Sequence, residues 1–213
     1  SSPEIVVAGS KETSKEPVSD MAAKPDFGYG RGATAILEKG DQFWSGMNLN
    51  LGKFANGDPI PEAKNDQEWR LAGTTGKPAW SYYKNNSSYG ARYGRLYNWF
   101  AVNDSRGLCP NGWHIPADDE WNILEREDVQ LKDFSGFPAI AGGLRLLDGS
   151  FNGLGSDSYW WSSTPVDAGG AWGHGWSKVT PSTRESFEKK AGLSVRCLDR
   201  KSTRLNSSHG YIS

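Results

Sequence analysis

The sequence lacks long apolar runs and has almost no net charge. No stretch approaches the roughly 18 consecutive apolar residues that a membrane-spanning helix needs, so no membrane span is expected. The 24 basic and 25 acidic residues leave a net charge of -1. Such a balance provides no field that would attract nucleic acid or an anionic lipid surface. Nucleic acid is therefore not an expected partner.

Cysteine is scarce, and recognisable catalytic patterns are missing. The only two cysteines are Cys109 and Cys197, too few to indicate a cellular compartment by their number. No Gly-x-Ser-x-Gly motif occurs, and no pattern joins His114 or His174 to a nucleophilic side chain. We therefore expect no catalytic residues and a protein that is not an enzyme.

Composition divides the chain into three segments. Residues 1–32 are rich in Pro, Ser, Lys and Glu with little apolar periodicity, which predicts a flexible linker or tether. Residues 201–213 break with the preceding pattern and resemble translated sequencing-adapter read-through, so we exclude them from the expected fold. Residues 33–200 have the length of one domain, with large aromatic rings and many glycine turns.

Two helices are expected in the first half of this domain. Apolar residues recur at helical spacing between Tyr93 and Phe100, which predicts an amphipathic helix near residues 91–102. Pro116 and an acidic first turn predict a second helix near residues 118–126, where the acidic side chains complement the helix dipole.

The second half of the domain has a β-type pattern. Three short runs are separated by Gly, Pro and Asp turns: YWWSST at 159–164, GAWGHGWSKV at 170–179 and GLSVRCLD at 192–199. No repeat of fixed period is present. The order predicts one loop-rich α+β domain, with two helices and a small, twisted, mostly antiparallel sheet.

Several short motifs follow one another in a fixed order along the domain. They are NLN at 48–50, YGRLYNWFAVND at 93–104, GLCPNGWHIPADDEW at 107–121, GSFNGLGSDSYWWSST at 149–164 and GLSVRCLDR at 192–200. In this order they resemble the Fibrobacter succinogenes major paralogous domain family over nearly all of residues 33–200. The resemblance implies a C-type-lectin-like fold and an exported bacterial protein, outside the cell or on its outer surface. A lipid anchor preceding Ser1 is compatible with this expectation.

The chain departs from the family pattern at two places. The segment between the GWHIPADDEW motif and GFPAIAGG at 136–143 is shorter than is common in members. Ala117 stands where a Ser or Thr would usually cap the helix, and such a cap is worth about 1 kcal/mol. We expect Asp118 to take over the capping role.

The two cysteines are expected to form a disulfide. Cys109 follows the first predicted helix, and Cys197 alternates with Leu193 and Val195 on one face of the last strand. Export would make oxidation available. The bond would close a loop of roughly 90 residues and stabilise the fold by up to about 4 kcal/mol. The alternative is two separate buried thiols.

The aromatic stretch provides the candidate ligand site. Alternation places Trp172, His174 and Trp176 on one face of a strand, where they either form an exposed platform or pack into the core. Trp160 and Trp161 point to opposite faces, so one is expected in the core and the other nearer the surface. Together with the flexible loop at 165–170, the candidates for binding a glycan or protein ligand are Trp161, Asp167, Trp172, His174 and Trp176.

An oxygen-rich loop raises the question of calcium. Asp148, Asn152 and Asp157 carry ligand atoms of the kind that calcium prefers. Their spacing matches neither an EF-hand nor the motifs of sugar-binding lectins, and Asp or Asn before Gly is an ordinary turn former. We therefore expect no cofactor, with calcium at these three residues as the alternative.

The combined pattern predicts a non-catalytic recognition module. One alternative is an enzyme related to the formylglycine-generating, sulfatase-modifying proteins. That chemistry depends on a close cysteine pair in the C-terminal part of the domain, where this chain has Cys197 alone. The other alternative is a structural spacer domain at the cell surface.

Overall fold

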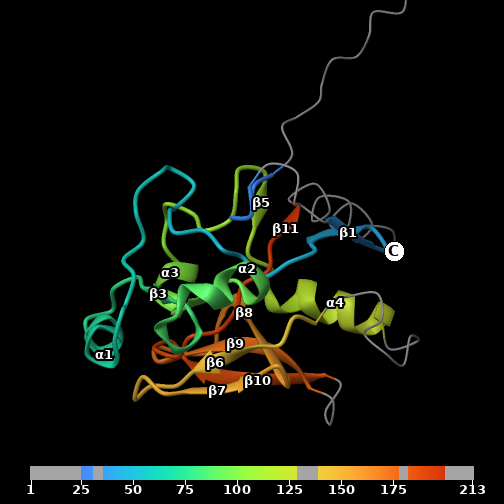
Figure 1. Cartoon of the computed structure of the whole chain (residues 1–213). Helices are drawn as coiled ribbons and strands as arrows, with labels where there is room; N and C mark the ends of the chain where they lie inside the picture. Colours follow the sequence, from blue (N-terminus) through green and yellow to red (C-terminus); the bar gives the residue numbers. More distant parts are fainter. Residues whose placement is uncertain (1–24, 31–35, 129–138, 178–181, 200–213) are drawn as a thin grey trace, which may run out of the picture.

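The computed structural model describes residues 25–30, 36–128, 139–177 and 182–199. These residues form two main sheets with a helix between them (Figure 1). The fold is therefore α+β, as expected. None of the described helices is long and apolar enough to cross a membrane. Most of the expected tether, and all of the tail at 201–213, lie outside the described residues.

The first sheet has four antiparallel strands and joins the beginning of the domain to its end. Their spatial order is β1 (Ile36–Lys39), β2 (Gln42–Ser45), β11 (Leu198–Asp199) and β5 (Trp113–His114). Leu198 pairs with Trp44 on one side and with His114 on the other. The last strand therefore lies between two strands that come much earlier in the chain, β2 and β5.

The second sheet contains the aromatic runs. Its order is β10 (Thr183–Glu188), β9 (Gly170–Ser177), β8 (Asp157–Pro165), β6 (Gly142–Arg145) and β7 (Phe151–Leu154). Only the β6–β8 pairing is parallel within this sheet. The prediction of mostly antiparallel pairing is confirmed, although two main sheets form instead of one.

Helix α4 (Asp118–Asp128) lies between the two sheets, where the second helix was predicted. Its inner face contributes Trp121 and Leu124 to a buried cluster with Trp44 of β2, Trp160 of β8 and Leu198 of β11. The indole rings of Trp121 and Trp160 stack with centroids 5.8 Å apart. This cluster binds the helix to both sheets at once.

The start of α4 is capped by residues other than the expected Asp118. The Thr164 hydroxyl of β8 accepts from the Asp118 backbone N–H at 3.0 Å. The Glu120 carboxylate accepts from the Ala117 backbone N–H at 2.8 Å, as in a capping box. The hydroxyl missing at Ala117 is thus replaced by one from a neighbouring strand.

The prediction of a single helix near residues 91–102 is wrong. The segment forms α2 (Gly90–Tyr93), the short strand β4 (Leu96–Tyr97) and α3 (Trp99–Val102). Gly94 has φ 73° and ψ -153°, which stops the helix. Strand β4 then pairs with β3 (Trp80–Ser81). Tertiary pairing therefore outweighs the helical spacing of the apolar residues.

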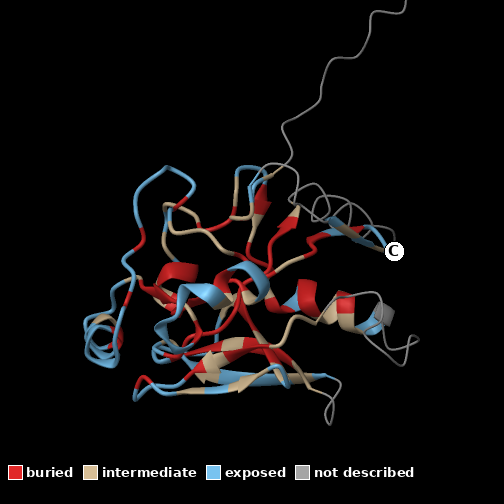
Figure 2. Ribbon diagram, viewed as in Figure 1, coloured by how far each residue is buried: buried red, intermediate tan, exposed pale blue. Residues whose placement is uncertain are grey.

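The sequence pattern also missed α1 (Asp66–Thr74) and the two 3-10 turns at Tyr83–Asn85 and Ser87–Tyr89. The Asn65 side chain caps α1 by accepting from the Glu68 backbone N–H at 2.9 Å. The helix buries Trp69 and leaves most of its surface in solvent (Figure 2). So narrow a buried face gives little apolar periodicity in the sequence.

The segment from Gly192 to Leu198 runs through the middle of the molecule and is buried throughout (Figure 2). Its residues alternate as predicted. Leu193, Val195 and Cys197 face the larger core cluster, whereas Leu198 faces the cluster beside α4. Elements cover both sides of this segment, so alternation here separates two cores instead of core from solvent.

Asn48 of the NLN motif is a fully buried hub beside this segment. Its Nδ2 donates to the carbonyls of Tyr93 and Ile140, at 3.0 and 3.2 Å. Its Oδ1 accepts from Trp160 Nε1 at 2.8 Å and from Arg196 Nε at 3.0 Å. One amide therefore connects four segments that are distant in sequence.

Two arginines are also fully buried. Burial lowers the pKa of Arg196 to about 9, and its Nη1 donates to the Ser45 carbonyl at 2.7 Å. Burial lowers the pKa of Arg145 to about 10, partly offset by a hydrogen bond to Asp66 at 3.0 Å. Both guanidinium groups remain charged at neutral pH and are held by hydrogen bonds, as buried charges require.

The expected disulfide is confirmed. Cys109 and Cys197 are bonded, at a sequence separation of 88. The bond fastens the loop after α3 to the buried C-terminal segment. Both cysteines belong to the larger core cluster.

Removing this bond is expected to lower the melting temperature by up to about 8–16 °C. Loop entropy predicts up to about 4 kcal/mol, and each kcal/mol moves the midpoint of a chain this size by roughly 2–4 °C. Calorimetry with and without reductant measures the change. The Cys109→Ser/Cys197→Ser double variant is the control, because its melting temperature should not respond to reductant. A wild-type protein insensitive to reductant would contradict the disulfide.

Candidate ligand-binding site

The aromatic site predicted from the sequence lies mostly in the interior. Trp161 is fully buried, and its Nε1 donates to the Tyr97 carbonyl at 2.7 Å. Trp160, on the opposite face, is 1% exposed. The expectation that one of this pair lies near the surface is wrong, because Trp160 packs in the cluster beside α4 and Trp161 packs in the larger core cluster. Trp161 is therefore a core residue.

Strand β9 has the alternation that the sequence indicates, but its aromatic face is covered. His174 is 2% exposed, whereas Trp172 and Trp176 are half-buried. Trp176 packs against the cluster beside α4, and the Arg184 guanidinium lies 3.4 Å from the centre of the Trp172 ring. The strand therefore presents no open platform on which a ligand ring could stack.

Asp167 stabilises its own turn. Its Oδ1 accepts from the backbone N–H groups of Gly169 and Gly170, both at 2.7 Å. These hydrogen bonds hold the pKa of the Asp167 carboxyl below its usual value. The residue is exposed, but one oxygen is already committed to shaping the β8–β9 connection.

The three calcium candidates do not form one site. Asp148 lies in the turn that connects β6 to β7, where it binds Ser150. Asn152 is the second residue of β7 and Asp157 begins β8, and each hydrogen-bonds to its own neighbour. Among the residues that the structure describes, no group of three or more His, Cys, Asp or Glu side chains is placed to hold a metal ion.

A charged network connects α4 to the second sheet. The His174 ring stacks on Trp121 with centroids 5.2 Å apart. Its Nδ1 lies 2.7 Å from Glu125 Oε1, and its Nε2 lies 3.1 Å from Asp118 Oδ1. Arg184 of β10 donates to both oxygens of Asp118, at 2.7 and 2.8 Å. The carboxylates of the helix thus meet a histidine and an arginine from two adjacent strands.

Burial alone would raise the pKa of Asp118. The hydrogen bonds from Arg184 and His174 outweigh this cost and hold the pKa below its usual value of 3.8. The same contact raises the pKa of Arg184 above its usual value. Asp118 is therefore ionised at neutral pH and serves as the fixed anion of the network.

The second histidine of the domain also binds the first turn of α4. His114 Nε2 lies 3.0 and 2.9 Å from the two oxygens of Glu120. The acidic first turn was interpreted from the sequence as complementing the helix dipole. Asp118 and Glu120 in addition position one histidine each, a role that spacing along the chain could not reveal.

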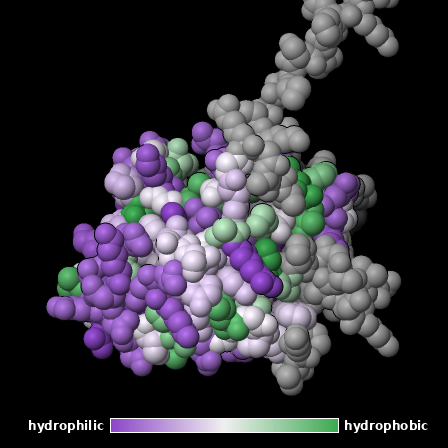
Figure 3. Space-filling model, in the orientation of Figure 1, coloured by the Kyte–Doolittle hydropathy of each residue, from purple (hydrophilic) through white to green (hydrophobic). Residues whose placement is uncertain are grey.

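The exposed surface offers no broad apolar patch in the view of Figure 3, where hydrophobic and hydrophilic side chains are interspersed. The large hydrophobic residues that are exposed are spread over β1, β2, α1, the β6–β7 turn and the β8–β9 connection: Ile36, Phe43, Leu71, Leu146, Leu147 and Val166. A concave site is therefore the better candidate for specific recognition.

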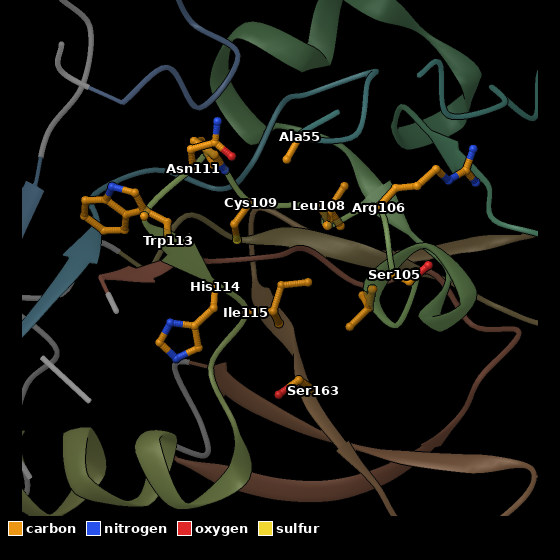
Figure 4. A pocket seen from close by; sticks show the side chains of 14 residues that line it. Ala55, Ser105, Arg106, Leu108, Cys109, Asn111, Trp113, His114, Ile115 and Ser163 are labelled. Carbon is orange, nitrogen blue, oxygen red and sulfur yellow. The ribbon is translucent and has the colours of Figure 1, made fainter. Parts of the chain in front are cut away.

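A pocket of about 460 Å³ opens beside the disulfide, between the loop after α3, strand β5 and the end of β8 (Figure 4). Pockets of about 300–1,000 Å³ are typical of ligand sites. Its apolar surface comes from Val102, Leu108, Cys109 and Ile115, and its polar groups come from Ser105, Arg106, Asn111, His114 and Ser163. Figure 4 shows Cys109 and Leu108 at the centre, Ala55 above them and Ser163 below.

The charges at this pocket are compensated. Arg106 Nε and Nη2 both donate to Asp104 at 2.8 Å, and Nη1 lies 3.3 Å from Asp58. The guanidinium also lies 4.0 Å from the centre of the Phe54 ring. Arg106 is therefore held in place and does not present a free charge to an anionic ligand.

Main-chain groups of the loop remain available. The backbone N–H groups of Leu108, Cys109, Asn111 and Gly112 make no hydrogen bond to any part of the chain that the structure describes. Gly112 has φ 86°, a conformation that favours glycine and sets the direction of the loop. The pocket thus combines an apolar floor with unpaired main-chain donors, none of which the sequence pattern had singled out.

The fold and the pocket define a disulfide-closed α+β domain with a preformed concave site. Residues 37–130 match the family model of the Fibrobacter succinogenes major domain, the family that the sequence motifs resemble. The match ends before β6. No curated protein and no solved structure matches the chain.

Replacing Asp118 with Asn is expected to flatten the loss of stability in acid. The folded pKa of Asp118 lies below 3.8, so its charge stabilises the fold above that pH. This contribution disappears as the pH falls through the folded pKa. Melting temperatures between roughly pH 2 and pH 7 measure it.

The matched control is Asp119→Asn, because Asp119 is adjacent in sequence but exposed. In acid, the melting temperature of Asp119→Asn should fall with pH as that of the wild type does. The melting temperature of Asp118→Asn should fall less steeply. The same fall of melting temperature with pH in all three proteins would contradict the assigned role of Asp118.

Proposed function

We propose that this domain is a non-catalytic recognition module that binds a segment of a protein partner in the disulfide pocket. The observation that carries the proposal is the pairing of an apolar floor with free main-chain N–H groups at Leu108, Cys109, Asn111 and Gly112. An extended peptide offers groups that complement this lining, namely main-chain carbonyls for the N–H groups and an apolar side chain for the floor. A glycan is the other ligand class that the sequence indicated.

The pocket is preformed, which favours binding. The disulfide, the Phe54–Arg106 contact and the Arg106–Asp104 ion pair hold its loop before any ligand arrives. A loop that is already ordered loses less conformational entropy on binding than a flexible one. The compensated charges favour a neutral ligand segment over a strongly charged one.

The arrangement of the histidines supports recognition over catalysis. His174 is 2% exposed, and carboxylates occupy both of its ring nitrogens, so it does not reach a substrate. His114 borders the pocket, but its Nε2 is bound to Glu120. A general base needs a nitrogen within hydrogen-bond reach of the proton that it removes.

The disulfide supports a location outside the cytoplasm, because such bonds persist mainly in oxidising compartments. We infer an extracellular or outer-surface position, with a lipid anchor beyond the N-terminal tether as one means of attachment. A C-type-lectin-like fold remains part of this proposal. Its support is the order of the motifs and the antiparallel aromatic sheet of the C-terminal half.

A second candidate function follows from the cysteine pair itself. Cys109 lines the pocket and is bonded to Cys197, so the close cysteine pair that the sequence lacked within its C-terminal part is completed across the fold. This favours an enzyme of the sulfatase-modifying kind as the alternative. Oxidation of a sulfatase cysteine peptide by the reduced protein with dioxygen supplied as the electron acceptor, lost on Cys109→Ser, would establish it.

The recognition proposal predicts that filling the pocket weakens binding. Peptides selected from a display library against the oxidised chain should bind Ala55→Phe about thirtyfold more weakly, because a blocked anchor pocket loses about 2 kcal/mol or more. Ala55 is exposed at the pocket, so the fold should tolerate the change. Titration calorimetry measures the affinities, and a glycan array tests the other ligand class in parallel.

The matched control is Ala91→Phe, an exposed alanine of α2 that does not line the pocket. It should bind the selected peptides as the wild type does. Peptides that bind both variants equally, or a library that yields no binder, would count against this site.

A further inference from the structure

A second pocket, of about 410 Å³, opens on the outer side of α4. Its lining consists of Asn122, Glu125, Arg126, Ser182 and Arg184. It shares no residue with the disulfide pocket. We propose that this pocket is a separate binding site for a hydroxyl-rich ligand, that is, a saccharide.

Three planar side chains each leave one polar atom unoccupied at this pocket. Arg184 uses Nε and Nη2 on Asp118, which leaves Nη1. Glu125 uses Oε1 on His174, which leaves Oε2. Asn122 makes only a long contact, 3.5 Å from Nδ2 to Asp118, which leaves Oδ1. Within the described residues, none of these three atoms has a hydrogen-bond partner.

Buried groups hold these side chains in place. Asp118 is 7% exposed and His174 is 2% exposed, and together they position Arg184 and Glu125. The Arg184 guanidinium also stacks on the Trp172 ring, 3.4 Å from the ring centre. Burying a histidine and a carboxylate is costly, and an apolar pair of the same size would join helix to sheet as well. The network is explained better as a support for the exposed polar atoms.

The chemistry of the free atoms fits neighbouring hydroxyl groups. A hydroxyl both donates and accepts, so one can donate to Glu125 Oε2 while it accepts from Arg184 Nη1. Asn122 Oδ1 and the Ser182 hydroxyl offer an acceptor and a donor to the next hydroxyl. A simple anion would meet the Glu125 carboxylate, and a cation would meet Arg184 and Arg126. A neutral polyol avoids both conflicts.

Nuclear magnetic resonance titration of the oxidised chain tests this site. The probes are the methyl glycosides of glucose, galactose, mannose and N-acetylglucosamine, with sodium acetate as the anion arm. At least one glycoside should shift the Asn122 side-chain amide and the Arg184 Nε–H signals. Asn122→Ala should weaken binding about tenfold, the value of roughly one well-made hydrogen bond.

The matched control is Asn103→Ala, an exposed asparagine outside both pockets, which should bind as the wild type does. Ser182→Ala is a second test variant and should also weaken glycoside binding. Because the Ser182 side chain is exposed and makes no contribution to the core, the fold should be retained. No shift with any glycoside, a shift with acetate alone, or binding unchanged in Asn122→Ala would overturn the proposal. The Ala55→Phe test concerns other residues, so failure of either proposal leaves the other standing.

Discussion

The rest of the structure depends on the burial of the segment from Gly192 to Leu198. This segment contacts β2, β4, β5, β6 and β8, which otherwise belong to three separate sheets. Its odd residues complete one core, and Leu198 completes the other. Hydrophobic and polar residues alternate along this segment, so its buried polar side chains need hydrogen-bond partners. Asn48 Oδ1 is such a partner for Arg196. The N-terminal half therefore cannot complete its core without the last residues of the domain.

The position of both pockets follows from this arrangement. Cys197 of the buried segment holds Cys109, which fixes the loop around the first pocket. Leu198 and Trp160 hold α4 between the sheets, which places its first turn beside two histidines and its outer face beside Arg184. Both proposed sites therefore lie on loops and a helix edge at the surface, whereas most of the tryptophans of the C-terminal half pack in the core.

The sequence predicted the elements whose pattern is local. Helix α4, the alternation of β8 and β9 and the disulfide pair all follow from spacing and composition. The break at Gly94 was not predicted, because the pairing of β4 with β3 decides it. The exposed helix α1 was not predicted either, because Trp69 is its one large buried side chain. The site was misjudged for a related reason. Alternation shows which residues share a face, but not that α4 covers the face that contains His174.

Residue-resolved amide hydrogen exchange of the oxidised domain tests the central role of the buried segment most directly. The amides of Leu193 and Ser194 donate to the carbonyls of Tyr97 and Tyr159, at 3.1 and 3.0 Å, within the interior. The Leu193 and Ser194 amides are expected to exchange only when the whole domain unfolds. Their free energy of opening should equal that of the Trp161 amide in β8. Exchange of Leu193 and Ser194 at the rate of an exposed turn, while β8 stays protected, would contradict it.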